Sequence, residues 1–222
     1  MSFIESIARE IQEDARFVGA WLGNKTRGGT FEGRRGPVVG IRGWMAGWPE
    51  DGLPNYMKGG DVGGILTDFG RQDGRVDYYV DKLHEVVKEW RDPVLVGMSM
   101  GGIVVARYAQ RIGWENIKGA MVVGVPLGGV KWFECVKMWG GVYADLAPNS
   151  QLLRELGKLI VPEGKQLVGI YADNDLKIGP PARHMTIPFT KTVVIPNVAH
   201  GEVQRNQKLW RELDKIVGGR EL

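Results

Sequence analysis

Short, continuously apolar runs alternate with segments of helical periodicity, and this alternation limits the fold more than any other feature of the sequence. The apolar runs cover residues 37–41, 63–67 (a weaker candidate), 94–96, 117–125, 167–171 and 192–195. The helical segments cover residues 76–90, 102–112 and 202–217. Strands that are apolar on both faces and separated by helices form parallel sheets through βαβ crossovers. The sequence therefore predicts an α/β fold, with a mostly parallel sheet and helices on both faces.

Three segments depart from this alternation. Residues 1–22 carry apolar side chains at helical spacing, which predicts an amphipathic N-terminal helix that packs on the sheet, mediates a dimer or touches a lipid surface. Residues 23–36 are polar and rich in glycine, which predicts a loop. Residues 127–156 hold helically spaced aromatic residues in a connection longer than a normal loop, which predicts a short helical lid or cap. Because no linker or repeat divides the chain, we expect a single domain over residues 1–222.

The composition argues against several classes of protein. Of the 222 residues, 43% are hydrophobic and 25% are charged, and the net charge of +3 is too balanced to indicate nucleic-acid binding. No apolar run approaches the roughly 18 residues that a membrane helix needs, and charged residues interrupt the first twenty positions, where a signal peptide has its apolar core. With Cys135 as the single cysteine and three histidines that lack zinc-binding spacing, we expect no metal or other cofactor. These features predict a soluble, cytoplasmic protein.

The run Gly97-Met-Ser-Met-Gly101 carries the sharpest chemical signal in the sequence. It fits the G-x-S-x-G pattern and stands between the apolar run 94–96 and the helical segment that begins at Gly102. In such a turn the serine has a strained backbone, and glycines two positions away on either side avoid collisions with the adjoining strand and helix. The pattern therefore predicts that Ser99 is a nucleophile, with a purely structural Gly-Ser turn as the alternative.

A serine hydroxyl needs a base to take its proton. In chains with this turn the order is nucleophile, acid, histidine, and only His184 and His200 follow Ser99. His200 follows the last apolar run, which places it in a loop at the same edge of the sheet as the serine. His200 is therefore favoured as the base, while His184 and His84 are interpreted as structural histidines.

The acid that orients the histidine is expected after the strand at residues 167–171. Asp173 and Asp175 both lie in the loop that follows this run. Asp175 is favoured because it lies further out on the loop, and Asp173 remains the alternative. The chosen carboxylate would hold the imidazole tautomer and stabilise the imidazolium, and the other would cap a turn.

An oxyanion hole needs two backbone N–H groups that point at the developing negative charge. The first is predicted at Met100, directly after the nucleophile. The second is predicted at Trp44, in the turn after the apolar run 37–41, where Gly43 lets the chain turn its amides inward.

Four segments together resemble the α/β-hydrolase superfamily, and in particular its small bacterial lipases and esterases. Residues 96–107 resemble the "VGHSMGG…AR" elbow and helix of the family, and residues 123–129 resemble its "GTPxxGs" segment. Residues 144–156 are similar to its "L-x-P-G-S-x-x-L-R-x-L" helix entry, and residues 197–200 resemble the loop of its catalytic histidine. The resemblance implies a minimal α/β-hydrolase fold of about six strands. The first two strands of the full fold are expected to be missing, because residues 23–36 are too polar and glycine-rich.

Two positions depart from the family pattern. Arg42 stands where the family has a histidine before the glycine of the oxyanion strand, and Met98 stands where it has a histidine before the nucleophile. Neither change removes a backbone donor or one of the three candidate catalytic residues. Both leave the subfamily and the substrate open.

The sequence favours a serine carboxylester hydrolase, an esterase or lipase, that acts on a small acyl ester or a lipid. Leu127, Trp132 and Phe133 are candidates for binding the acyl group, although an ordinary core face explains them equally well. An acyltransferase or thioesterase with the same catalytic residues is the first alternative. A non-catalytic binding protein of the same fold is the second.

Overall fold

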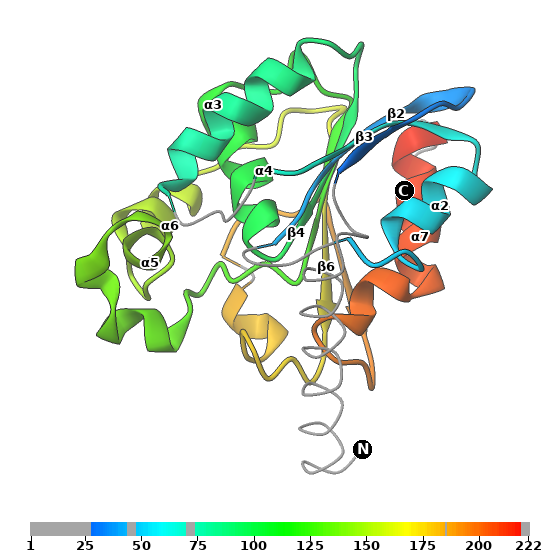
Figure 1. The fold of residues 1–222 in the computed structure, drawn as a ribbon. Helices are drawn as coiled ribbons and strands as arrows, with labels where there is room; N and C mark the ends of the chain where they lie inside the picture. Colours follow the sequence, from blue (N-terminus) through cyan, green and yellow to red (C-terminus); the bar gives the residue numbers. More distant parts are fainter. Residues whose placement is uncertain (1–27, 44–47, 70–73, 185, 219–222) are drawn as a thin grey trace.

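The computed structural model describes residues 28–43, 48–69, 74–184 and 186–218. These residues form one sheet of seven strands, with helices packed against it (Figure 1). Its strands are β1 (Gly29–Phe31), β2 (Arg35–Ile41), β3 (Val62–Thr67), β4 (Val94–Met98), β5 (Gly119–Val123), β6 (Leu167–Ala172) and β7 (Lys191–Ile195). They lie in the order β1-β3-β2-β4-β5-β6-β7. All neighbours are parallel except β1, which runs antiparallel to β3. The predicted mostly parallel α/β sheet is therefore confirmed.

Strand β1 corrects two expectations, because the sheet has seven strands where about six were expected, and β1 lies inside the segment 23–36 predicted as a loop. Gly29, Thr30 and Phe31 pair with residues 64–66 of β3. An edge strand is paired on one side only and has an exposed surface, so it does not need the continuous apolar run that marks a buried strand. A polar, glycine-containing sequence is compatible with this position, which is why its composition resembles that of a loop.

Helices cover both faces of the sheet (Figure 1). The α-helices are α2 (Leu53–Gly59), α3 (Val76–Val87), α4 (Met100–Arg111), α5 (Gly141–Asp145), α6 (Gln151–Leu156) and α7 (Gln207–Gly218). The 3₁₀ helices are η1 (Lys131–Cys135), η2 (Lys137–Trp139), η3 (Pro181–His184) and η4 (Glu202–Arg205). Helices α3 and α4 lie on one face, and α2 and α7 lie on the other. The helix predicted over residues 202–217 is divided into η4 and α7, and α2 was not predicted.

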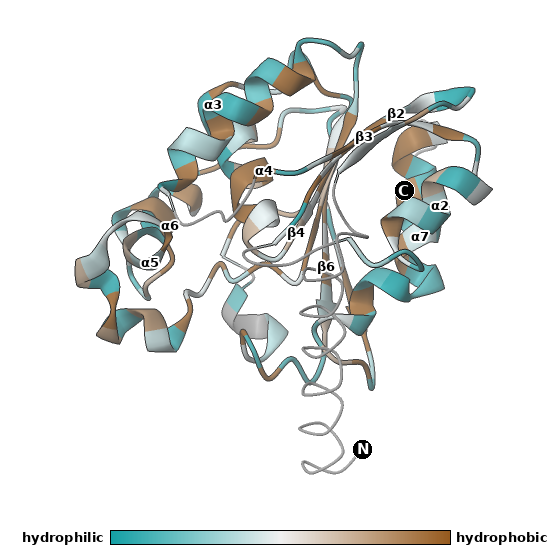
Figure 2. Ribbon diagram, viewed as in Figure 1, coloured by the Kyte–Doolittle hydropathy of each residue, from teal (hydrophilic) through white to brown (hydrophobic). Residues whose placement is uncertain are grey.

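Each face of the sheet has its own apolar core. Leu83 of α3 and Val104 of α4 are fully buried in the first core, and Leu53 of α2 and Leu213 of α7 are buried in the second. In Figure 2 the strands and the sheet-facing sides of these helices are largely hydrophobic, whereas their outer sides are hydrophilic. Burying one such side chain stabilises a fold by about 1.5–3 kcal/mol, so the helical periodicity of the sequence is explained by these two layers.

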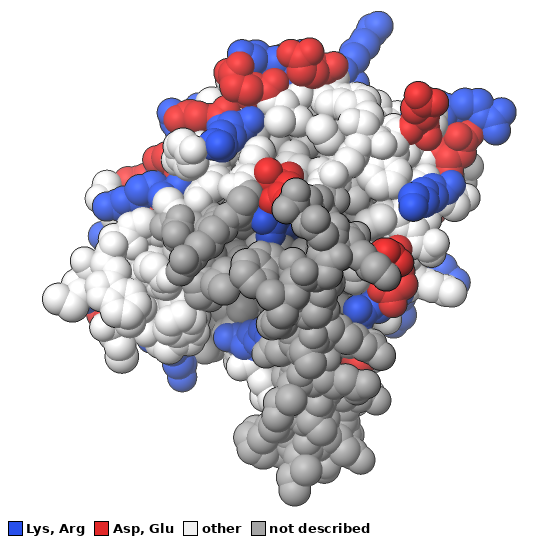
Figure 3. All heavy atoms as spheres, viewed as in Figure 1, with Lys and Arg blue, Asp and Glu red and all other residues white. Residues whose placement is uncertain are grey.

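The molecular face in Figure 3 carries mixed charge. Basic and acidic side chains are interspersed along its upper and right-hand edges, and the part around α5 has few charged groups. Among the described residues no helix is both long enough and apolar enough to cross a membrane.

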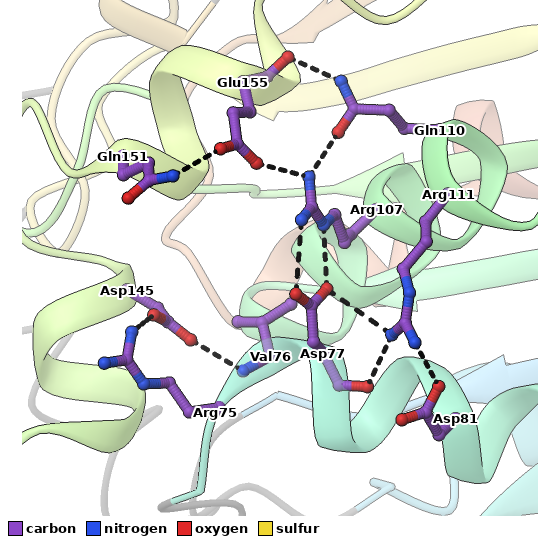
Figure 4. Close-up of polar contacts among 10 residues, drawn as sticks. All are labelled: Arg75, Val76, Asp77, Asp81, Arg107, Gln110, Arg111, Asp145, Gln151 and Glu155. Carbon is purple, nitrogen blue, oxygen red and sulfur yellow. Dashed lines mark hydrogen bonds and ion pairs between the residues drawn. The ribbon is translucent and has the colours of Figure 1, made fainter.

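Polar contacts tie the second half of the segment 127–156 to α3 and α4 (Figure 4). The buried Asp145 of α5 accepts the Val76 backbone N–H at 2.8 Å and a hydrogen bond from Arg75 at 2.6 Å. Asp145 thereby caps the first turn of α3, a helix that begins without a side-chain cap of its own.

Arg107 of α4 is the centre of a second set of contacts in the same region (Figure 4). Its guanidinium lies 2.8 Å from Asp77 of α3 and 2.9 Å from Glu155 of α6. Gln110, one turn further along α4, donates to the Glu155 backbone oxygen at 2.5 Å. The 3₁₀ helices η1 and η2 take no part in these contacts, so the polar anchors act on α5 and α6.

We predict that Asp145→Ala lowers the free energy of unfolding by about 2 kcal/mol, because it leaves the buried Val76 N–H without its charged acceptor. Urea denaturation followed by circular dichroism measures this change. Asp81→Ala is the matched control, since Asp81 is 61% exposed and its ion pair with Arg111 contributes about 0.5 kcal/mol or less. Equal effects of the two substitutions would contradict the capping role of Asp145.

Candidate active site

Ser99 occupies a strained turn between β4 and α4. Its backbone angles are φ 50° and ψ −121°, in the region of positive φ that residues other than glycine rarely adopt. The Ser99 N–H donates to the Val123 oxygen at 2.7 Å, and the Ser99 carbonyl accepts from the Gly102 N–H at 3.0 Å. The surrounding backbone therefore maintains the strain, as it does at many functional sites.

The glycines on either side of Ser99 permit close backbone approaches. A Cβ on Gly97 would lie 2.5 Å from the Gly101 oxygen, and a Cβ on Gly101 would lie 2.2 Å from the Ile41 oxygen. Both distances are shorter than a real Cβ contact allows. The G-x-S-x-G spacing is thus explained by the packing of the start of α4 against the ends of β4 and β2.

Asp175 and His200 lie together after the carboxyl ends of the neighbouring strands β6 and β7. His200 Nδ1 lies 2.6 Å from Asp175 Oδ2. Asp175 Oδ1 accepts the backbone N–H groups of Lys177 and Ile178, each at 3.0 Å. The side chain of Asp175 is 1% exposed and that of His200 is 11% exposed, so the pair is largely removed from solvent.

Two opposing effects set the pKa of Asp175. Burial disfavours the charged carboxylate and by itself raises the pKa. The positive charge and hydrogen bond of His200 and the two backbone N–H groups lower it by more. The pKa of Asp175 therefore lies below its ordinary value of 3.8, and the carboxylate remains ionised as an acceptor for the imidazole.

The end of β5 connects this pair with Ser99. The His200 ring lies over Gly124, where an added Cβ would be 2.9 Å from the ring atom Cε1. Gly124 has φ +57°, and it directly follows Val123, whose carbonyl accepts the Ser99 N–H. The structure thus brings Ser99 to Val123 and the His200–Asp175 pair to the next residue, Gly124, at the same edge of the sheet.

The alternative acid and base have other partners. Asp173 Oδ1 accepts the Asn197 backbone N–H at 2.9 Å, in an exposed part of the loop. His184 is fully buried, and its two ring nitrogens lie 2.9 Å from the Gly128 N–H and the Ile178 carbonyl oxygen. His84 lies on α3 with its Nδ1 3.3 Å from the Tyr108 hydroxyl of α4.

Of the two predicted oxyanion donors, Met100 lies within the described residues and Trp44 does not. Met100 is the first residue of α4, so its N–H has no acceptor within the helix, and the partial positive charge of the helix N-terminus is concentrated there. Trp44 lies outside the described residues. Arg42, just before this gap, is buried and forms an ion pair with Asp68 at 2.5 Å.

The residues predicted to bind an acyl group lie on one segment, where their exposure differs. Leu127 and Phe133 are 3% exposed and belong to the core beside α3 and α4. Trp132 is 51% exposed and packs edge-to-face on Phe133, with ring centroids 4.3 Å apart. Among the described residues no group of three or more histidine, cysteine, aspartate or glutamate side chains is arranged to hold a metal ion.

Gly124 and Ile178 belong to this site but were not singled out from the sequence. Gly124 lies under the His200 ring, and Ile178 donates to Asp175. A signal for Gly124 was present, because it stands in the run 123–129 that resembles a family segment. Its role depends on a contact with a residue far away in the chain, which local patterns do not reveal.

No protein-family model matches this sequence, and no curated protein matches it. Solved structures match it in fold. A monoacylglycerol lipase of Paleococcus ferrophilus has a TM-score of 0.65 and 15% identity, over 87% of this chain and 98% of that chain. A bromoperoxidase from Bacillus anthracis has a TM-score of 0.62 and 18% identity, over 86% of this chain and 94% of that chain.

A third similar structure is MGS-MChE2, an α/β hydrolase from the metagenome of lagoon sediments in Morocco. It has a TM-score of 0.63 and 18% identity, over 85% of this chain and 94% of that chain. The chain therefore has the α/β-hydrolase fold, as the sequence resemblance implied. The structures that share this fold include lipases and esterases as well as enzymes named after other reactions.

We predict that Gly124→Ala displaces the His200 ring from Asp175, because the new Cβ would come within 2.9 Å of the imidazole. Gly164→Ala is the control, since Gly164 also has positive φ (+78°) but has open space around its Cβ position. Both variants are expected to lose about 1–2 kcal/mol through backbone strain. Crystal structures of the two variants would test the difference, and an undisturbed His200–Asp175 contact in Gly124→Ala would contradict it.

The lowered pKa of Asp175 predicts a contribution to stability that depends on pH. A carboxyl group with a lower pKa in the folded state stabilises the fold fully above its unfolded pKa, near 3.8, and loses this contribution as the pH falls through the folded value. The wild type should therefore be more stable than Asp175→Asn, and the difference in free energy of unfolding should be larger at about pH 5 than at about pH 2.5. Urea denaturation at the two pH values measures this, and an equal difference at both would refute the lowered pKa.

Proposed function

We propose that the protein is a serine carboxylester hydrolase in which Ser99, His200 and Asp175 form the catalytic triad. The observation that carries this proposal is the convergence at the end of β5. The strained Ser99 backbone is bound to Val123, and the buried His200–Asp175 pair lies against the next residue, Gly124. A strained serine beside a buried histidine–carboxylate pair has the residue types that nucleophilic acyl transfer needs.

The reaction would proceed in two halves. In the first, Ser99 Oγ attacks the acyl carbonyl while His200 takes the hydroxyl proton, and the tetrahedral intermediate collapses as His200 returns that proton to the leaving alcohol. In the second, water attacks the acyl-enzyme with His200 again as base, which releases the carboxylic acid and restores the serine hydroxyl. Asp175 holds the imidazole tautomer and stabilises the imidazolium in both halves.

The oxyanion would be held by backbone amides. The Met100 N–H fits this role because it is the first of α4 and lacks an acceptor within the helix. The Trp44 N–H is proposed as the second donor. Both are amides, so replacement of the family's histidine by Arg42 leaves these donors in place.

The proposed substrate is a small acyl ester or a lipid, with Leu127, Trp132 and Phe133 as the proposed acyl-binding residues. Leu127 lies in the loop that follows β5 and Gly124, and Trp132 and Phe133 lie in η1 at the end of that loop. The structural similarity to a monoacylglycerol lipase and to metagenome-derived lipolytic enzymes supports an ester substrate. Of the three, Trp132 is 51% exposed and offers an aromatic surface to an acyl chain, while the buried Leu127 and Phe133 would support it from the core.

We expect the protein to hydrolyse p-nitrophenyl esters, and Ser99→Ala to lower kcat/KM by at least about 10³-fold. A fluorophosphonate should label Ser99, as shown by mass spectrometry of the adduct. Ser150→Ala is the matched control, because Ser150 caps α6 and should affect stability but not labelling. A panel of esters of graded chain length, with and without an added alcohol, then distinguishes hydrolysis from acyl transfer.

Equal turnover by wild type and Ser99→Ala, or labelling at another residue, would exclude this mechanism. Absence of both turnover and labelling in the wild type would favour a binding protein of the same fold.

A further inference from the structure

His184 contacts the loop that carries Asp175, and its hydrogen bonds indicate its protonation state and tautomer. The Gly128 N–H can only donate, so His184 Nδ1 accepts it at 2.9 Å. The Ile178 carbonyl can only accept, so Nε2 donates to it at 2.9 Å. His184 is therefore a neutral imidazole with its proton on Nε2, fully buried and stacked on the Tyr171 ring at 6.1 Å with an interplanar angle of 12°.

The peptide group that His184 binds is also bound to Asp175. The carbonyl of this group belongs to Ile178, and its N–H belongs to Gly179 and donates to the Asp175 backbone oxygen at 2.9 Å. The N–H of Ile178 itself donates to Asp175 Oδ1 at 3.0 Å. A bond to the carbonyl of a peptide polarises its N–H, so the two hydrogen bonds of this peptide strengthen each other.

We propose that His184 is a positioning residue that holds Asp175 in place for His200. Its Nε2–H fixes the Ile178–Gly179 peptide, and this peptide and the Ile178 N–H fix the backbone and the carboxylate of Asp175. Its Nδ1 connects the same unit to Gly128, in the loop that follows β5. His184 therefore connects the loop that carries Asp175 with the loop after β5, in which Gly124 lies under the His200 ring. This inference rests on the proposed function and adds a residue to its machinery.

Two amide substitutions separate the two contacts of His184. The amide nitrogen of glutamine can occupy the place of Nε2, so His184→Gln retains a donor for the Ile178 carbonyl. The amide oxygen of asparagine can occupy the place of Nδ1, so His184→Asn retains only the acceptor for Gly128. If the bond to Ile178 is the functional one, glutamine rescues and asparagine does not.

The test measures ester hydrolysis and the imidazole proton of His200 in each variant. We expect His184→Asn to lower kcat by roughly 10- to 100-fold with less than about a threefold change in KM, because small displacements of a catalytic group have such effects. The proton between His200 Nδ1 and Asp175 should give a far-downfield ¹H NMR signal, assigned by its loss in His200→Gln. This signal should vanish or broaden in His184→Asn and persist in His184→Gln.

His84→Asn is the control, since His84 lies on α3 and makes no contact in this chain of hydrogen bonds. Thermal unfolding of all variants shows whether they are folded. Full kcat and an intact downfield signal in His184→Asn would overturn the proposal. It would also be overturned if the asparagine and glutamine variants lost kcat equally and in proportion to their loss of thermal stability. Because the NMR signal does not require turnover, it tests His184 even if the wild type hydrolyses no ester.

Discussion

Parallel hydrogen bonding between β4, β5, β6 and β7 brings chain segments that are distant in sequence to one edge of the sheet. The register pairs Met98 with Val123, and Ala172 with Ile195, so these strands end at nearly the same level. The loop that follows each strand must then start at that edge. Ser99 and the His200–Asp175 pair depend on this alignment, because each follows the end of one of these strands.

Within that frame, electrostatics and sterics act on different parts of the site. The buried Asp175 stays charged because backbone N–H groups and His200 compensate its desolvation. Ser99 keeps its strained backbone because hydrogen bonds and the absence of neighbouring Cβ atoms allow it. Both arrangements cost stability locally, and the two apolar cores on either side of the sheet offset that cost.

Much of the fold followed from the sequence because buried elements have strong patterns. The strand β4 and the helix α4 were predicted from a continuous apolar run and a helical period. Strand β1 and helix α2 were missed, since β1 is a three-residue edge strand and α2 has only seven residues with two buried side chains. Chain order and loop position favoured Asp175, but only the fold shows that Asp173 binds Asn197 while Asp175 contacts His200.

Strand β1 also bears on whether further chains can add to the sheet at its edges. Unpaired strand edges are templates on which other chains add, and long apolar edges promote aggregation. Here β1 offers three residues, and β7, at the opposite edge, begins with Lys191, which is paired with Glu212 of α7 at 2.9 Å. A short edge strand at one side of the sheet and a charged residue at the other are both features that limit the addition of further strands.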